Sequence, residues 1–499
     1  MLPLLRSIFS EWPWVAPLLV VVSLTMSLTT VAAVLLDRRC RSQSAISWVL
    51  LVIAAPFIGP IIYWIFGKPW LSARREASYL AVAEERSETR RRDEAGGAGA
   101  ARRRARESVF RSLTQDQRRI ATQASSISGD FPLGGNDIEL FDEAEELFRR
   151  MADDIGRAER HVHIVFYIAL DDATSCHVFR ALEEAARRGI PCRLLLDGLG
   201  SRAFLKSARC AELAKAGVQV VEALPVGMLR RRFGRIDLRN HRKIVVIDGA
   251  VGYIGSHNLA SKDFKVKERY APWIDATMRI KGRVANDLQK IFAEDWFLET
   301  DEDLWSLVTQ NVGDGVEPAI AQVLGTGPAT YESAMPQMIL SLVHLAEEEV
   351  ILTTPYFVPD EPTLAALLTA ARRGVRTVLI MPEFNDSLLV KLASRKFYQR
   401  LLEAGVELWL YRGGLLHSKT IVADGRTSLM TSANLDRRSF ELNLEASMVV
   451  YDAEVSGRLR ALQEGYLARS RRILPAEWYG RPWWKRLVEN AVGLLSPLL

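Results

Sequence analysis

Two short motifs place the same polar residue types at the same spacing in this chain of 499 residues. In each motif, a lysine follows a histidine by two residues and an aspartate follows the lysine by five. An asparagine then follows the aspartate by ten residues, with a serine two residues before it. The copies are His241-Arg-Lys243 to Asp248 with Ser256 and Asn258, and His417-Ser-Lys419 to Asp424 with Ser432 and Asn434. Such agreement indicates duplicated chemistry.

This set of residue types suits an anion better than a metal ion. An ammonium group is not a metal ligand and repels cations, whereas lysine and asparagine donate hydrogen bonds to phosphate oxygens. The short serine side chains would let the backbone approach such a group closely. We therefore predict no metal site and no cofactor, and we predict phosphate binding by the serines and asparagines of both motifs: Ser256, Asn258, Ser432 and Asn434.

Two such motifs facing each other would surround one phosphodiester. One imidazole can attack phosphorus and form a phosphohistidine. The other can protonate the leaving alkoxide and then deprotonate an incoming hydroxyl. The lysines would stabilise charge on the non-bridging oxygens. The predicted catalytic residues are therefore His241, Lys243, Asp248, His417, Lys419 and Asp424, and the near-equivalent motifs leave open which histidine attacks.

The carboxylates near these motifs are predicted to support the histidines. On a strand, residues two apart share a face, so each histidine faces the same way as its lysine. Asp248 and Asp424 then fall on the opposite face or in the turn that follows, where a structural role is expected. Asp275 follows His241 by 34 residues and Glu445 follows His417 by 28, both in apolar, strand-like runs. A buried carboxylate requires a partner, so we predict that these two orient the histidines.

The motifs lie within two similar stretches of alternating strand and helix patterns. Short β-rich runs such as HVHIVFYI and VILTTPYFV each precede an amphipathic stretch ending in AARRG, and a strand after AGV follows in both. This alternation predicts an α/β fold in which each half is a β-sheet covered by helices. We place the first half at residues 131–315 and the second at 316–472.

The N-terminus is predicted to form a membrane anchor over residues 1–71. Residues 15–36 and 46–66 carry no charge, and each run would be about 32 Å long as a helix, enough to cross a bilayer. Arg38, Arg39 and Arg41 separate the runs, and the outer flanks carry slightly more cationic residues. The lengths of the two runs predict two transmembrane helices. The cationic residues on the outer flanks favour an orientation with both termini and the body in the cytoplasm.

Two further segments have biased compositions. Residues 72–130 are arginine-rich with few large apolar residues, which predicts a tether, either a solvated spacer or a segment lying on anionic head groups. Residues 473–499 contain WWKRLVENAVGLL, whose spacing predicts an amphipathic helix, either at the membrane interface or packed on the body.

The composition narrows the class of protein. Apolar residues make up 48% and charged residues 25% of the chain, as in folded proteins. Four cysteines exclude a disulfide scaffold. The formal net charge of +5 matches the excess of thirteen arginines over eight acidic residues in Ser72–Arg119. The remaining chain is balanced, so a body that binds nucleic acid is not indicated.

The paired HxKxxxxD motifs resemble those of the phospholipase D superfamily, and the likeness narrows to bacterial cardiolipin synthases. The resemblance covers nearly the whole chain except the tether. Further segments that support it are GPIIYWIFG, RNHRKIVVIDG, TPYFVPD and NLDRRSFELNLE. The resemblance implies two phospholipase D-like halves, each a mixed sheet, in a multi-pass protein of the bacterial inner membrane. It implies condensation of two phosphatidylglycerols into cardiolipin and glycerol without metal or nucleotide. It also implies that His241, in the first motif, is the nucleophile and that His417 is the acid. Thr431 departs from the family's usual glycine and is expected to narrow the second phosphate cradle.

Three alternatives stay open at this stage. The covalent intermediate can pass to water, which would make the protein a hydrolytic phospholipase D. The donor can be phosphatidylethanolamine. A protein of another class, a non-catalytic membrane adaptor that binds anionic lipid through its arginines, would not need two histidines at these offsets. Neither the acyl-chain preference nor the oligomeric state follows from the sequence.

Overall fold

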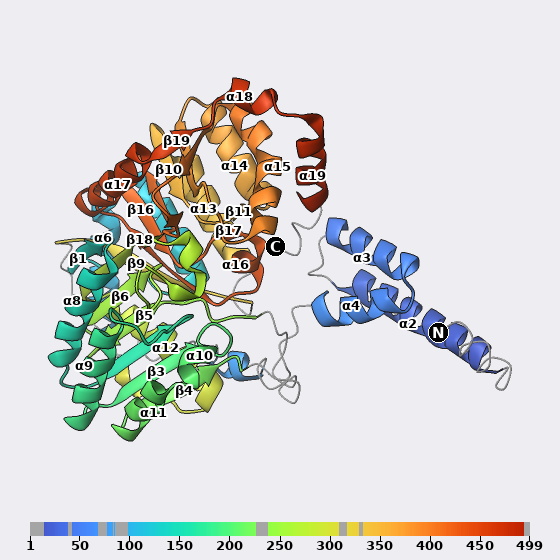
Figure 1. Ribbon diagram of the computed structural model, residues 1–499. Coiled ribbons are helices and arrows are strands. Elements are labelled where there is room, and N and C mark those ends of the chain that lie inside the picture. Colours follow the sequence, from blue (N-terminus) through green and yellow to red (C-terminus); the bar gives the residue numbers. More distant parts are fainter. Residues whose placement is uncertain are drawn as a thin grey trace. The chain divides into compact units, whose positions relative to one another are not determined.

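The computed structural model describes residues 14–37, 42–67, 77–82, 84, 98–225, 238–308, 317–328 and 333–493 (Figure 1). The chain forms two compact units. The N-terminal unit includes Met1–Ser72, and the body comprises Ala73–Arg230 and Asp237–Leu499. All of the motif residues belong to the body.

The N-terminal unit has one helix that is long and apolar enough to cross a membrane. Helix α2 (Val15–Leu36) contains the apolar stretch Pro17–Leu36. The prediction of a second membrane-spanning helix at 46–66 is wrong, because the chain forms two short helices there, α3 (Ser42–Ala54) and α4 (Ile58–Phe66). At 1.5 Å per residue they are only about 20 and 14 Å long.

Pro56 explains the break between α3 and α4. Proline has no backbone N–H to donate to the preceding turn, and its ring clashes with that turn. The Pro56 carbonyl lies outside both helices and accepts hydrogen bonds from Ser23 Oγ at 3.4 Å and Ser27 Oγ at 3.2 Å, both on α2. Gly59 then lies against the backbone of α3, where a Cβ atom would be 2.6 Å from the Leu51 carbonyl oxygen. The three helices therefore pack as a small bundle.

The first half of the body is built on a mixed sheet of seven strands. In spatial order these are β1 (Asn136–Phe141), β8 (Thr277–Gly282), β6 (Val251–Gly255), β5 (Ile244–Ile247), β2 (Val162–Phe166), β3 (Cys192–Asp197) and β4 (Gln219–Ala223). Strands β2, β3 and β4 are parallel, and the remaining neighbours pair antiparallel. The histidine motif leads into β5, beside the parallel strands.

The second half repeats this topology in a sheet of eight strands. In spatial order these are β9 (Ala321–Thr326), β18 (Glu445–Val450), β16 (Thr427–Thr431), β15 (Thr420–Ala423), β10 (Glu349–Thr353), β12 (Arg376–Pro382), β13 (Glu407–Tyr411) and β19 (Ser470–Arg472). The first seven correspond one by one to the strands of the first sheet, and β19 adds an edge strand. The predicted α/β fold with two similar halves is confirmed.

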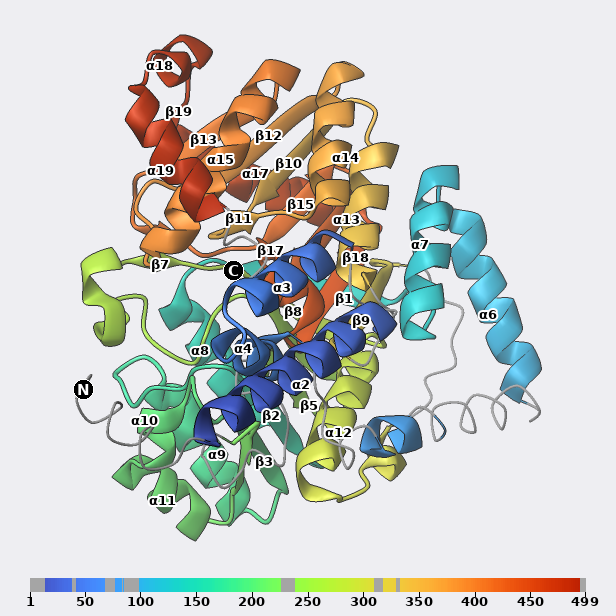
Figure 2. The ribbon, with the colours of Figure 1, turned by 90° about the vertical axis from the view of Figure 1, so that its right-hand side faces the viewer.

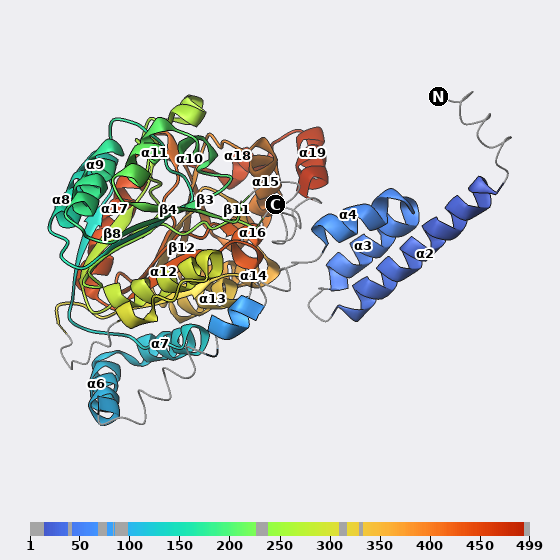
Figure 3. The same cartoon turned by 90° about the horizontal axis from the view of Figure 1, so that it is seen from below.

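Helices cover the sheets in a matching way. Helices α8 (Ala144–Gly156) and α9 (Cys176–Arg187) pack on one face of the first sheet, and α13 (Ala334–Leu345), α14 (Glu361–Arg372) and α15 (Leu388–Ala404) pack on the second (Figure 3). A shared apolar cluster joins the sheets, with α12 (Ala285–Thr300) and α17 (Ala453–Ala468) contributing to it. The shorter helices of the first half are α10 (Arg202–Leu205), α11 (Ala208–Lys215), η2 (Lys265–Tyr270) and η3 (Trp305–Leu307). The two halves therefore form one body.

Part of the predicted tether is a packed element. Residues 72–76, 83 and 85–97 lie outside the described residues, but α6 (Ala98–Ser112) and α7 (Gln115–Ser128) follow them. Thr114 and Gln117 form a capping box at the start of α7. Ile120, Ala121 and Ala124 of α7 are buried in the core of the second half. The expectation of a tether up to residue 130 therefore fails for α7, whose small buried residues gave no strong apolar signal.

Candidate active site

The two histidine segments cross between the halves. Strand β14 (Leu415–Leu416), just before His417, pairs in parallel with β7 (Trp273–Ile274) of the first half. In the same way, Asn240 forms a bridge to Leu444 of the second half. The His417 amide donates to the Ile274 carbonyl at 2.7 Å, and the His241 amide donates to the Leu444 carbonyl at 2.9 Å. Each histidine therefore lies beside the chain segment that carries the other half's carboxylate.

The carboxylates are exchanged between the halves. His241 Nδ1 lies 3.0 Å from Glu445 Oε2, and His417 Nδ1 lies 2.7 Å from Asp275 Oδ1. The sequence had associated each carboxylate with the motif that precedes it in its own half, and the structure pairs each with the other motif. In each pair, the carboxylate can accept a hydrogen bond from the Nδ1–H group of the ring. The other ring nitrogen, Nε2, is then the one available to react with a substrate.

The lysines are fixed by their own motifs. Lys243 Nζ donates to the His241 carbonyl at 2.7 Å, and Lys419 Nζ donates to the His417 carbonyl at 2.5 Å. Both side chains are buried. Burial lowers the pKa of Lys243 to about 8 and, together with repulsion from Lys243, lowers that of Lys419 to about 7. Removal from water destabilises the charged ammonium form of each lysine. A bound anion would stabilise that form again, so the lysines favour an anionic ligand.

The charges of one motif act on the other motif. Burial lowers the pKa of His241, and Lys243 and Lys419 lower it further, against the opposing effect of Glu445. Burial and Lys419 lower the pKa of His417 to about 4, and Lys243 of the other half adds to this. Burial alone would raise the pKa values of Asp275 and Glu445, but the histidines and lysines lower them. The two motifs therefore form one electrostatic site.

The motif aspartates lie at the turns, where they bind backbone amides. Asp248 accepts the N–H groups of residues 159, 160 and 161 at 2.7 to 2.9 Å. Asp424 accepts those of residues 347, 348 and 349 at 2.9 Å. Both residues have positive φ, 57° and 52°, a conformation that aspartate tolerates better than most residues. The carboxylates hold the start of β2 and β10, whereas the carboxylate partners of His241 and His417 are Glu445 and Asp275.

The predicted phosphate-binding residues divide into two groups. Ser256 Oγ donates to the Ala276 carbonyl at 3.3 Å, and Ser432 Oγ donates to Glu445 Oε2 at 2.5 Å. Both serines are therefore engaged with the carboxylate segments. Asn258 and Asn434 are buried, and the Oδ1 atom of each has no hydrogen-bond partner among the described residues. An amide oxygen accepts, so a ligand that donates, such as a substrate hydroxyl, would complete it, whereas a phosphate oxygen would accept from the Nδ2 group of the same side chain.

Thr431 does not project into the phosphate-binding side of the motif. Its Oγ1 lies 2.7 Å from Ser447 Oγ on β18 and accepts the Ala433 amide at 3.0 Å. At the matching Gly255, a Cβ atom would lie 2.4 Å from the Ala276 carbonyl oxygen. Both positions therefore face the neighbouring strand, so the expected narrowing of the second cradle by Thr431 is not supported.

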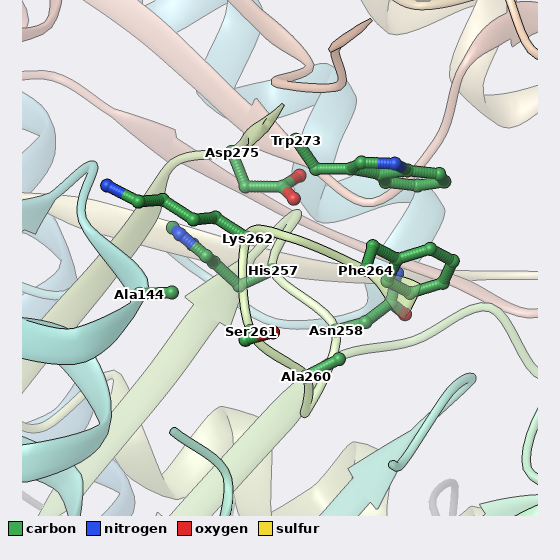
Figure 4. A pocket seen from close by; sticks show the side chains of 9 residues that line it. All are labelled: Ala144, His257, Asn258, Ala260, Ser261, Lys262, Phe264, Trp273 and Asp275. Atoms are coloured by element: carbon green, nitrogen blue, oxygen red, sulfur yellow. The ribbon is translucent and has the colours of Figure 1, made fainter. Parts of the chain in front are cut away.

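The sequence analysis missed the aromatic neighbours of the histidines. The Tyr167 ring lies edge-on to His241, with 5.1 Å between centroids, and Lys243 Nζ lies 5.5 Å from the same ring. The centroid of the Trp273 ring lies 4.7 Å from that of the His417 ring. Its place two residues before Asp275 was a usable signal. Trp273, Asp275 and Asn258 also line a small pocket with Ala144, His257, Ala260, Ser261, Lys262 and Phe264 (Figure 4).

A buried ion pair behind His241 was also missed. Arg242 pairs with Asp295 of α12, and its guanidinium also donates to the carbonyls of Glu445 and Thr326 at 3.1 and 3.2 Å. The arginine therefore links the first motif to the second sheet. Within the described ranges, no three His, Cys, Asp or Glu side chains gather as a metal-binding group.

Comparison with known proteins identifies the family. Residues 151–296 and 339–464 match the family described as "Cardiolipin synthase, PLD-like domain", and residues 27–68 match "Phospholipase_D-nuclease N-terminal". The chain belongs to the cardiolipin synthase family. It is 34% identical to cardiolipin synthase A of Wigglesworthia glossinidia brevipalpis, over 95% of this chain and 94% of that protein. It is 36% identical to cardiolipin synthase A of Klebsiella pneumoniae (strain 342), over 96% and 98% of the two chains.

The fold recurs outside the cardiolipin synthases. Phosphatidylserine synthase from Haemophilus influenzae Rd KW20 superposes with a TM-score of 0.56 at 14% identity, covering 77% of this chain and 98% of that one. At this identity the likeness extends to the fold alone. The resemblance to the phospholipase D superfamily and to cardiolipin synthases is confirmed, with two phospholipase D-like repeats.

Proposed function

We propose that this protein transfers a phosphatidyl group from one phosphatidylglycerol to another, giving cardiolipin and glycerol. The observation that carries the proposal is the exchange of Asp275 and Glu445 between the two histidine motifs, which makes a single site from both halves. That site has two oriented imidazoles and two buried ammonium groups, the groups that a phosphodiester exchange requires.

The reaction follows in two steps. His241 Nε2 attacks phosphorus, the bond from phosphorus to the head-group oxygen breaks, and His417 donates a proton so that glycerol leaves. A hydroxyl of the second phosphatidylglycerol then loses its proton to His417 and attacks phosphorus, which releases His241. One phosphodiester is replaced by another, so no nucleotide is consumed.

The protonation states of the two histidines suit this sequence. With lowered pKa values, both imidazoles are neutral near pH 7 before substrate binds, as a nucleophile must be. His417, as the acid, must carry a proton. The negative charge of the bound phosphodiester opposes the effect of Lys243 and Lys419 and so raises the pKa of His417. Asn258 and Asn434 complete the contacts to the non-bridging oxygens.

The membrane attachment is proposed to be a single crossing by α2. Because α3 and α4 are too short to span, a single crossing by α2 would separate the cationic residues that follow it in the sequence from the single arginine that precedes it. The excess of cationic residues favours the cytoplasm for the body of this bacterial inner-membrane enzyme. Protease treatment of intact and everted inner-membrane vesicles tests this, because the body should be digested only in the everted ones.

Reconstitution tests the proposed reaction and its rivals. The purified full chain is incubated with phosphatidylglycerol alone, and the lipids and free glycerol are measured. Cardiolipin and glycerol in equal amounts support the proposal. Phosphatidic acid as the main product would indicate a hydrolase, and cardiolipin only when phosphatidylethanolamine is added would indicate a different donor. Absence of any product would favour a lipid-binding adaptor.

The covalent intermediate has its own test. Rapid quenching in base during turnover should preserve a phosphatidyl adduct on His241, since phosphoramidates are stable to alkali. An adduct on His417 would reverse the two roles. Absence of an adduct on either histidine would contradict the two-step mechanism.

A further inference from the structure

The exposed apolar side chains of the body are concentrated in one region. The start of α15, the preceding loop and the C-terminal segment expose Phe384, Leu388, Leu389, Leu474, Tyr479, Trp483, Trp484, Leu487 and Val488. In the remaining described part of the body, only Leu80 and Leu199 are large apolar residues of comparable exposure. We call the nine residues the apolar rim. Exposure on this scale, gathered on neighbouring elements, marks an interaction surface.

Helix α19 (Trp483–Gly493), which follows α18 (Pro475–Tyr479), is fixed to the body by its polar side. Glu489 is buried and accepts hydrogen bonds from Arg481 at 2.8 Å and Arg395 of α15 at 3.4 Å. Gly493 lies against Lys396 of α15, and Figures 1 and 2 show the two helices side by side. Val492 also packs on the core of the second half, but the larger apolar side chains of α19 face outside, the reverse of an ordinary packed surface helix.

The outward face of α19 has the composition of a membrane-interface helix. Trp483, Trp484, Leu487 and Val488 recur at helical spacing, and Trp483 is 69% exposed. Lys485 and Arg486 lie between them in the sequence, so one cation flanks each side of the apolar stripe. Tryptophan at the interface with lysine and arginine beside it is the pattern that binds an anionic lipid surface.

The rest of the apolar rim connects this helix to the catalytic site. The loop before α15 is tied down by Asn385 Nδ2, which donates to the Pro355 carbonyl at 2.8 Å, and by Asp386. Asp386 accepts a hydrogen bond from Tyr356 at 2.7 Å and pairs with Lys267 of η2. Exposed Phe384 and Leu388 therefore lie on a fixed support next to η2.

Aromatic contacts continue from η2 to the reacting histidine. Phe264, the residue before η2, stacks on Trp273 at 4.2 Å, and Trp273 lies 4.7 Å from His417. The rim's loop is thus linked to η2 by the Asp386–Lys267 ion pair, and stacked rings lead from the residue before η2 to His417.

We propose that the apolar rim docks the body onto the surface of an anionic bilayer, with the active site opening beside the lipid. The purpose of the docking, delivery of phosphatidylglycerol, rests on the proposed function. The evidence for the docking itself is the exposure and the charge of the rim. It differs from anchoring by α2, because α2 only tethers the chain, whereas the rim would orient the site. A second copy of the chain or its own N-terminal helices are the other possible occupants.

Photocrosslinking in the full chain tests the occupant directly. A benzophenone amino acid replaces Leu487, and the protein is reconstituted in vesicles of phosphatidylglycerol and phosphatidylcholine. The control position is Thr122, an exposed residue of α7, and Figure 2 shows α7 on the opposite side of the body from α19. Adducts with lipid at position 487 and not at 122 support the proposal. Crosslinks to another copy, to residues 14–67, or to lipid equally at both positions would overturn it.

A kinetic comparison tests the consequence. The triple variant Trp483→Ser/Trp484→Ser/Leu487→Ser should lose at least about tenfold in turnover of phosphatidylglycerol held in vesicles. It should keep its turnover of a monomeric short-chain phosphatidylglycerol, and the control Leu80→Ser should keep both. Equal turnover on vesicles, or equal loss on both substrates, would overturn the docking role. If the wild-type chain crosslinks to lipid but makes no cardiolipin, the proposed function fails and the docking surface stands.

Discussion

The two halves place their histidines alike but surround them differently. His241 faces Glu445 and the edge of the Tyr167 ring, whereas His417 faces Asp275 and Trp273. The pKa of His417 is lowered to about 4, and that of Lys419 to about 7 against about 8 for Lys243. The second motif is therefore the harder one to protonate in the empty site.

This difference teaches how a duplicated motif acquires two roles. The spacing from histidine to aspartate fixes the same backbone in both halves, as the matching turns of Asp248 and Asp424 show. The carboxylates come from the residue after β7 and from the start of β18, and the aromatic neighbours are Trp273 of β7 and Tyr167, which follows β2, so the surroundings of the two histidines have diverged. The shared motif determines position, whereas burial and the lysines, opposed by the exchanged carboxylate, determine how readily each histidine is protonated.

The largest expected effect tests whether both motifs are required. His241→Ala and His417→Ala should each reduce cardiolipin formation by about 10⁴-fold or more, and the double variant should be little worse, because residues that act as a unit are not additive. Quantitative lipid analysis of the purified variants measures this. Retention of a tenth of the activity in either single variant would mean that one half is dispensable.

The next largest effect tests the exchange of carboxylates. Glu445→Gln and Asp275→Asn should each cost about 10²–10⁴-fold, because the amide no longer fixes the tautomer and orientation of the histidine. Glu445→Gln, although in the second half, should suppress the adduct on His241. If it instead left adduct formation normal and slowed only its breakdown, Glu445 would serve His417 in function.

The pH dependence tests the difference between the lysines. The protonated form of each is lost as pH rises through its pKa, about 7 for Lys419 and about 8 for Lys243. The value of kcat/KM, which reports the free enzyme, should fall above about pH 7, by about tenfold per pH unit for each lysine required. In kcat the fall should move to higher pH, because the bound phosphodiester stabilises the ammonium groups. If the loss of activity at high pH had the same midpoint in kcat as in kcat/KM, this expectation would be contradicted.

A smaller effect on activity is expected at the turn aspartates. Asp248→Ala should lower the free energy of unfolding by about 2–4 kcal/mol, since three backbone amides lose a charged acceptor. Asp248→Asn, which keeps one acceptor and tolerates positive φ, should lose less. Chemical denaturation measures the loss, and turnover of the folded fraction should change less than about fivefold. A large loss of turnover with normal stability would place Asp248 in the chemistry.

The smallest effect is expected at the position where the motifs differ in sequence. Thr431→Gly removes the contact to Ser447 and should cost about 1 kcal/mol in stability, with turnover within about threefold of wild type. Thermal unfolding and lipid analysis measure the two quantities. A clear gain in turnover would restore the idea that Thr431 narrows the phosphate cradle.

The sequence predicted what repeats locally and missed what depends on distant pairing. The offsets in the two motifs were sufficient to predict both histidine and lysine pairs and the duplicated α/β halves. The exchanged carboxylates are 204 and 142 residues from their histidines, and nothing in the local pattern specifies such pairings. Residues 46–66 have the hydropathy of a span, but one proline ends the helix. Similarly, α7 buries alanines that hydropathy does not distinguish from a solvated helix.

The exchange of carboxylates also sets a schedule for the appearance of activity during synthesis. When the first half leaves the ribosome, His241 has no acceptor for its Nδ1 proton, because Glu445 is made 204 residues later. At about 5–20 residues per second, that delay is roughly 10–40 s. A nascent or truncated first half next to the membrane therefore lacks the assembled nucleophile and cannot cleave the lipids around it. Dependence of each half on the other keeps a lipid-cleaving centre inactive until the chain is nearly complete.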